Sequence, residues 1–285
     1  MRYFLISLFS LLVTLDSHCQ DTRQEMAVYN IGLGSLAGGA GALLHKKSNE
    51  KFGKVLLKGL AQGALGGYFV HESKNLVGRI SSSGRLEYGW GAKFTNAIGT
   101  SIIENASQNR DFWEKWNLHI GFNRLEFYTK EKFSVKYRIM PFSLFFTAYT
   151  AFGNKFEISK SLQLGEIIYS GKPTGPTVQG VVAGATWANV IELNSLSVND
   201  ASIISHELIH VFQYYDLNYF NSFISKPIKN LSESSNSFRK FNSIFYLDAQ
   251  LPVFGGLYLL ENINRKNYYD NFFENEAGVY SNTLE

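Results

Sequence analysis

The stretch SHELIHVFQYYD, residues 205–216, places two histidines four positions apart, with a glutamate directly after the first. Asn199 or Asp200 just before it can cap a helix, because either side chain accepts hydrogen bonds from the free N–H groups at a helix start. The apolar residues in between fit a largely buried helix from Ala201 to about Tyr215. This segment therefore predicts a buried helix that carries polar residues in an apolar setting.

On such a helix, four residues turn the chain through about 400°, so His206 and His210 point the same way, roughly 6 Å apart along the axis. Two neutral imidazoles at that spacing suit two corners of a tetrahedral Zn²⁺ ion. Glu207 lies about 100° round from His206, where a carboxylate can take a proton from zinc-activated water. The alternative is a pair of core histidines whose hydrogen bonds are satisfied without a metal. Chance alone yields the pattern in about one of a hundred such chains.

A catalytic zinc site also needs a third protein ligand and an open fourth position. The other histidines all lie upstream without metal-ligand spacing, at positions 18, 45, 71 and 119. Asp216 stands where some zinc sites carry a third histidine, and an aspartate there can ligate. The better candidates are Glu274 and Glu276 in YYDNFFENEAGVYSN, residues 268–282, at the head of an expected short helix. The alternative for both is a solvated first helical turn, which the helix dipole favours.

The pairing of HELIHVFQYYD with a distal FENEA resembles the gluzincin zinc metallopeptidases, in which a glutamate from a second helix joins a helical HExxH motif. It is especially similar to uncharacterised bacterial proteins with a HELxHVxQ helix, an apolar segment and a phrase of the type YRxNPFExEA. Here the apolar segment is FYLDAQLPVFGGLYLLE, and the last phrase reads YYDNFFENEA without the proline. The resemblance covers residues 200–282, roughly 30% of the chain. HExxH with HVxQ is fairly specific, whereas ExEA alone is weak.

The resemblance implies that one of the two distal glutamates is the third zinc ligand. Many gluzincins show an ExxA pattern followed by Asp or Asn, which selects Glu274 and places Gly278 where an acid would support a ligating histidine. The other register, with NEA as the ligand phrase, selects Glu276. Tyr214 or Tyr280 would stabilise an oxyanion, a role that tyrosine often has in such enzymes.

The implied reaction is hydrolysis of peptide bonds in a peptide or protein substrate by metal-activated water. Glu207 would take the proton of the water as it attacks the carbonyl and then deliver that proton to the leaving amine. The substrate would lie along a sheet edge, with TWANVIELN (residues 186–194) as the candidate strand.

The first twenty residues, MRYFLISLFSLLVTLDSHCQ, have the form of an export signal, with Arg2 before an apolar run and a short polar segment after it. Cleavage after Cys19 makes residues 1–19 a signal peptide and leaves a mature chain without cysteine. The alternative is a lipoprotein in which Cys19 is acylated. Both predict an exported protein that is periplasmic, outer-membrane-associated or secreted.

Residues 20–116 form a glycine-rich region in which glycines recur at spacings of three and four, as in Gly34, Gly38 and Gly41. On helices this spacing lets two backbones approach closely. We therefore expect a tightly packed helical hairpin, followed by a further helical stretch. The alternative is a hairpin that lies on or dips into a membrane and makes peripheral contact with it.

From residue 117 the hydrophobic pattern changes to a period of two, as in FSVKYRIM. LHIGFNRLEFYT and SLFFTAYTAFG are expected to be neighbouring strands, KFEISKSLQLGEIIYSG to add one or two more, and ATWANVIELNS one more. Residues 117–195 are therefore predicted to form an antiparallel β region, and residues 196–285 zincin-like metal-binding helices. The expected fold is α+β.

The composition excludes some classes of function. Charged residues make up 18% of the chain, the formal net charge is only +3, and the basic residues are dispersed. No stripe of lysine and arginine interleaved with aromatics is present, which argues against a nucleic-acid partner. Two other hypotheses remain beside the peptidase. One is a membrane-associated structural or assembly protein with a non-catalytic zinc site, and the other is an exported binding domain without metal.

Overall fold

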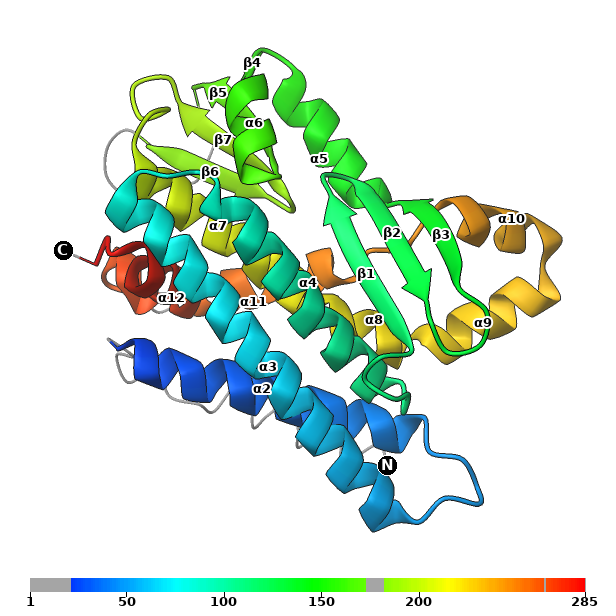
Figure 1. The fold of residues 1–285 in the computed structure, drawn as a ribbon. Helices are drawn as coiled ribbons and strands as arrows, with labels where there is room; N and C mark the ends of the chain where they lie inside the picture. Colours follow the sequence, from blue (N-terminus) through cyan, green and yellow to red (C-terminus); the bar gives the residue numbers. More distant parts are fainter. Residues whose placement is uncertain (1–21, 173–181, 264, 285) are drawn as a thin grey trace.

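A computed structural model describes residues 22–172, 182–263 and 265–284 of the chain. The predicted signal peptide, residues 1–19, lies outside the described residues. The chain has an α+β fold in which helices predominate and two small sheets are separate from each other. Figure 1 shows the N-terminal helices crossing one side of the molecule, with both sheets beyond them.

The glycine-rich region forms three long helices: α2 (Arg23–Leu44), α3 (Phe52–Ser83) and α4 (Tyr88–Ser107). Glycines lie where α2 and α3 meet, and a Cβ built on Gly34 would stand 2.5 Å from the carbonyl oxygen of Gly63. The expected close-packed hairpin is thus confirmed, and its glycines lie in the contact between the two helices. Among the described helices, α2 has the length and composition of a membrane span, a test that buried helices of soluble proteins and signal sequences also pass.

The first sheet is an antiparallel meander of β1 (Lys115–Ile120), β2 (Asn123–Tyr128) and β3 (Ser134–Ile139). The alternating segment FSVKYRIM contributes β3, as predicted, and LHIGFNRLEFYT contributes both other strands. Gly121, at φ +52°, occupies the turn between β1 and β2, a backbone conformation that favours glycine.

The segment SLFFTAYTAFG was predicted to be a strand, and this prediction is wrong because the segment lies in helix α5 (Pro141–Ala151) and the turn after it. Pro141 is compatible with the first helical turn, where no intrahelical N–H bond is needed. The carboxylate of Asp248 accepts hydrogen bonds from the backbone N–H groups of Phe142 and Ser143 and satisfies two free donors. A contact from far along the chain thus stabilises the helix start.

The second sheet corrects the prediction of one antiparallel region over residues 117–195. It contains β4 (Lys155–Phe156), β5 (Ile167–Gly171), β6 (Gly184–Trp187) and β7 (Val190–Asn194) in the order β4-β5-β7-β6. Strands β5 and β7 run parallel, and helix α6 (Ile158–Leu164) lies between β4 and β5. The single strand expected for ATWANVIELNS is a hairpin of β6 and β7 that turns at Ala188, a residue with φ +54°.

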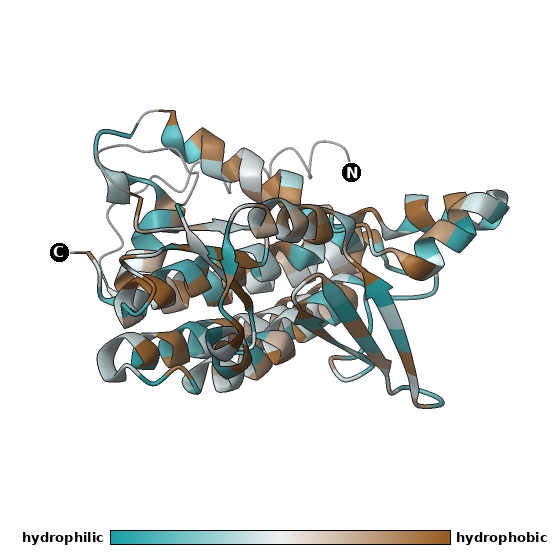
Figure 2. Cartoon of the chain, turned by 90° about the horizontal axis from the view of Figure 1, so that it is seen from above, coloured by the Kyte–Doolittle hydropathy of each residue, from teal (hydrophilic) through white to brown (hydrophobic). Residues whose placement is uncertain are grey.

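The C-terminal part is helical, as expected. It contains α7 (Ala201–Asp216), η1 (Leu217–Tyr219), α8 (Phe220–Phe223), α9 (Ser225–Ser234), α10 (Asn236–Ile244), α11 (Gln250–Asn262), η2 (Tyr268–Asp270) and α12 (Phe272–Ser281). Helix α7 is buried from Ile204 onward and packs against α3, α12 and β6. Helices α9 and α10 extend from the body as an arm, on which Figure 2 shows both hydrophilic and hydrophobic residues.

Candidate metal centre

Helix α7 places the residues of the HExxH motif in the core. The Asp200 carboxylate caps the helix by accepting hydrogen bonds from the N–H groups of Ser202 at 2.9 Å and Ile203 at 3.4 Å. One turn further on, His206 and His210 are buried on the same face. The predicted helix and its cap are both confirmed.

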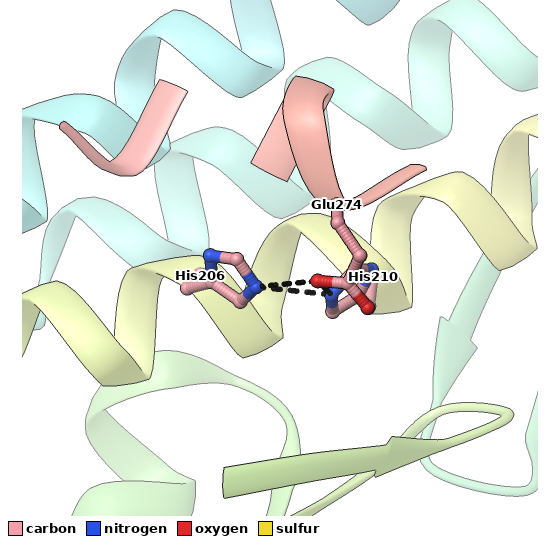
Figure 3. A group of neighbouring side chains, drawn as sticks. All are labelled: His206, His210 and Glu274. Atoms are coloured by element: carbon pink, nitrogen blue, oxygen red, sulfur yellow. Dashed lines mark hydrogen bonds and ion pairs between the residues drawn. The ribbon is translucent and has the colours of Figure 1, made fainter. Parts of the chain in front are cut away.

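Helix α12 brings a carboxylate to the two histidines. Asn271 caps this helix through the N–H groups of Phe273 and Glu274, and the Glu274 side chain extends toward α7. Its Oε2 lies 3.0 Å from Nε2 of His206 and 3.2 Å from Nε2 of His210, and the two Nε2 atoms are 3.2 Å apart. Figure 3 shows the two rings on α7 and the carboxylate reaching them from α12.

These distances fit a tetrahedral zinc site. With zinc bonds of about 2.0–2.1 Å, two ligand atoms of a tetrahedron stand about 3.3 Å apart. All three observed separations are within a few tenths of an ångström of this length. The donor set of two imidazoles and one carboxylate is also one that zinc accepts, with a fourth position left for water or substrate.

Gln213 determines which nitrogen of His210 is free to bind a metal. The Gln213 amide nitrogen donates to the carbonyl of Phe273 at 2.8 Å and to Glu276 at 3.0 Å, so its Oε1 faces His210 Nδ1 at 2.7 Å. An amide oxygen only accepts, so this network assigns the proton to Nδ1 and leaves the Nε2 lone pair toward the cluster. Such outer partners normally orient ligating histidines.

The electrostatics of the cluster favour a cation. Burial disfavours the charged form of Glu274, but His210 and His206 outweigh burial and hold the pKa of that carboxyl well below its usual range. Burial likewise lowers the pKa of His210, and the charge of Glu274 overrides it and raises that pKa to about 9. A proton and a metal ion therefore compete for the same lone pair.

Glu207 faces the β6 edge of the second sheet. Its Oε2 accepts a hydrogen bond from the Thr186 hydroxyl at 2.7 Å, and a Cβ built on Gly184 would stand 2.8 Å from its Oε1. Burial raises the pKa of the Glu207 carboxyl, while nearby His210 and His206 partly oppose the rise. A raised pKa lies nearer to neutral pH, where a carboxyl group can both accept and release a proton efficiently.

Two alternative ligands lie elsewhere. Glu276 accepts hydrogen bonds from Lys74 at 2.8 Å and Asn30 at 2.8 Å, and Asp216 forms an ion pair with the same lysine at 2.7 Å. Position 278, where the resemblance implied an acid, is Gly278, and the described partner of His210 Nδ1 is Gln213. The Nδ1 of His206 lies 3.2 Å from the Thr283 hydroxyl.

Two tyrosines that sequence reasoning missed contact the cluster. Tyr258 of α11 donates to Oε1 of Glu274 at 2.5 Å, and the hydroxyl of Tyr268 lies 3.5 Å from Nε2 of His206. The hydroxyls of the predicted tyrosines are engaged elsewhere, with Tyr214 bonded to Asp248 and Tyr280 bonded to His71. The one sequence feature that could have predicted the contact of Tyr268 is its place in the phrase that carries Glu274. No sequence feature pointed to Tyr258.

Comparison of the chain with family models, curated proteins and solved structures found no match in any of the three.

Proposed function

We propose that the protein is an exported zinc-dependent peptidase, with a zincin-like C-terminal part in which His206, His210 and Glu274 hold the metal. The observation that carries the proposal is the convergence of three ligand atoms at the edge lengths of a zinc tetrahedron. Two Nε2 lone pairs and a carboxylate oxygen repel one another unless a metal ion or a proton lies between them. A zinc ion in that place supplies Lewis-acid activation of water and of the substrate carbonyl.

In this proposal Glu207 is the general base. Its carboxylate is buried beside the histidine pair, and Thr186 fixes its orientation. It would accept a proton from the attacking water and pass that proton to the amine as the peptide bond breaks. The raised pKa of Glu207 supports both halves of this transfer.

The two contacting tyrosines would have different roles. Tyr258 occupies Oε1 of Glu274 and so directs Oε2 toward the histidines. The Tyr268 hydroxyl lies beside His206 and would donate a hydrogen bond to the substrate carbonyl oxygen as negative charge develops on it. Tyr268 therefore replaces Tyr214 and Tyr280 as our candidate for stabilising the oxyanion.

Strand β6 offers a place for an extended peptide. It is the last strand in the order β4-β5-β7-β6, and no described strand pairs with its outer edge. Thr186 in this strand contacts Glu207, so a peptide added along β6 would pass close to the base. Strand addition provides main-chain hydrogen bonds without demanding particular side chains. We therefore propose peptides or unfolded protein segments as the substrate class.

The variant Glu207→Gln tests this function. The amide keeps the size of the side chain but cannot accept the proton, so zinc content should stay unchanged while hydrolysis of a peptide library falls about 10²–10⁴-fold. The matched control is Glu25→Gln, at an exposed carboxylate on α2. Equal hydrolysis by wild type and Glu207→Gln would refute the role of Glu207.

The second candidate is a membrane-associated structural protein in which zinc only joins α7 to α12. The apolar helix α2 is the observation that favours it. This candidate predicts a zinc-replete protein that detergent alone extracts from membranes and that leaves the whole peptide library intact. Removal of zinc would then lower the melting temperature without affecting any activity.

A further inference from the structure

A second site lies away from the metal centre, between the first sheet and the α9–α10 arm. It is a cavity of about 410 Å³ lined by residues of α4, β1, β2, β3, α9 and α10. None of the metal-centre residues lines it, so its chemistry can be considered separately.

The base of this cavity is a buried ion network with more positive than negative charges. Glu104 and Glu126 are its two carboxylates, and Lys115, Arg124 and Arg138 approach them at 2.6–3.0 Å. Three cations share two carboxylates, which leaves one positive charge uncompensated. Glu104 is the one acidic side chain among the residues that line the cavity.

Three more cations line the cavity. Lys229 pairs with Glu233 at 3.7 Å, whereas Lys136 and Arg110 each carry donor capacity that the described residues leave unused. Lys136 on β3 stands opposite Glu126, but the other cations already occupy that carboxylate, and Lys136 has no hydrogen bond or ion pair with a described residue. Burial and the charges of Arg138 and Lys115 lower the pKa of Lys136, while Glu126 partly opposes this shift. Arg110 has a buried Nη1 without a described hydrogen-bond partner.

We propose that this cavity binds a phosphate group. Lys136, Arg110 and the surplus charge of the network together supply about three positive charges, enough for the dianion of a phosphate or phosphate monoester and for the single charge of a phosphodiester headgroup. Its several acceptor oxygens would accept hydrogen bonds from the free ammonium of Lys136 and from the guanidinium of Arg110, both of which line the cavity. Hydroxyl and amide groups of Ser232, Asn242 and Tyr128 in the lining add neutral hydrogen-bonding partners.

The phosphate has two possible sources that share this chemistry. The arm beside the cavity is amphipathic and exposes Leu231, Phe241 and Ile244, which suits contact with a lipid surface and binding of a phospholipid headgroup. A soluble phosphate ester would use the same cations without the arm.

Calorimetric titration of the protein with inorganic phosphate and glycerol phosphate tests the site. Sedimentation with vesicles of phosphatidylcholine, alone or mixed with phosphatidylglycerol, tests the lipid source. Lys136→Gln should weaken binding about tenfold or more, because a hydrogen bond to a charged group is lost. Lys132→Gln is the matched control, since Lys132 is an exposed lysine of the β2–β3 turn and does not line the cavity.

Lys136-dependent binding of the soluble phosphates supports the site with a soluble ligand. Lys136-dependent binding of the phosphatidylglycerol vesicles alone supports it with a lipid headgroup. Equal binding by wild type and Lys136→Gln would overturn the proposal, as would no binding of any phosphate by the folded wild type. Circular dichroism of each variant verifies folding, and Arg110→Gln provides a second, independent loss of charge in the cavity.

Discussion

Replacing Gln213 by methionine removes the group that fixes the tautomer of His210 and keeps the volume of the side chain. Gln213 accepts from His210 at 2.7 Å and donates to Phe273 at 2.8 Å and Glu276 at 3.0 Å. Without the acceptor, the His210 proton is no longer held on Nδ1, and the Nε2 lone pair is less available to the metal. Loss of an outer partner of this kind typically weakens metal binding about 10–100-fold, or about 1.4–2.7 kcal/mol.

The variant should also be less stable in the metal-free state. The variant cannot make the two hydrogen bonds that Gln213 donates, so the buried carbonyl of Phe273 and an oxygen of Glu276 each lose a partner. This loss lowers the free energy of unfolding by about 1–3 kcal/mol. Zinc affinity is measured by competition with a chelating dye, and stability by urea unfolding of the metal-free protein. Gln108→Met is the matched control, because Gln108 donates to Ser222 outside the metal centre. Unchanged zinc affinity in a folded Gln213→Met protein would refute the assigned orientation of His210.

Three further predictions concern catalysis, helix packing and pH. Tyr268→Phe should keep zinc and lower kcat about 10²–10³-fold, the usual effect of losing an oxyanion donor. Steady-state kinetics measures this change, and an unchanged kcat would contradict the role of Tyr268. Gly63→Ala should cost about 1–3 kcal/mol in urea unfolding because its new Cβ meets the carbonyl of Gly34, whereas Gly53→Ala on the same helix, with open space around it, should not destabilise. Burial and Arg124 hold the pKa of His119 well below 6.5, so the unfolded chain binds a proton there that the folded chain does not, and stability should fall as pH drops below about 6.5. His119→Gln should make that fall shallower, and identical slopes would contradict this reasoning.

The elements that local signals determine were predicted well. The Asp200 cap, the HExxH helix and the glycine-rich hairpin each depend on residues a few positions apart, so the sequence displays their cause. The error at α5 has the opposite origin. Its phenylalanines and its tyrosine favour strands, but Asp248, more than a hundred residues away, satisfies the N–H groups at the helix start.

The third ligand illustrates the same limit within the site. Glu274 and Glu276 are two positions apart on one helix, so their side chains point about 200° apart and only Glu274 reaches the histidine pair. Lys74 on α3 binds Glu276 and is remote in sequence, so the motif alone left the choice open. The basic cavity could not be predicted from the sequence either. Arg110 and Lys136 line the same cavity only because α4 and the first sheet pack together.

Metal analysis of protein purified without chelators tests the central claim most directly, with His210→Ala and Glu276→Gln analysed beside the wild type. The account predicts about one tightly bound zinc ion per chain in the wild type and in Glu276→Gln, and a large loss of zinc in His210→Ala. Equal zinc in His210→Ala and wild type, or a folded wild type that binds no zinc, would contradict it.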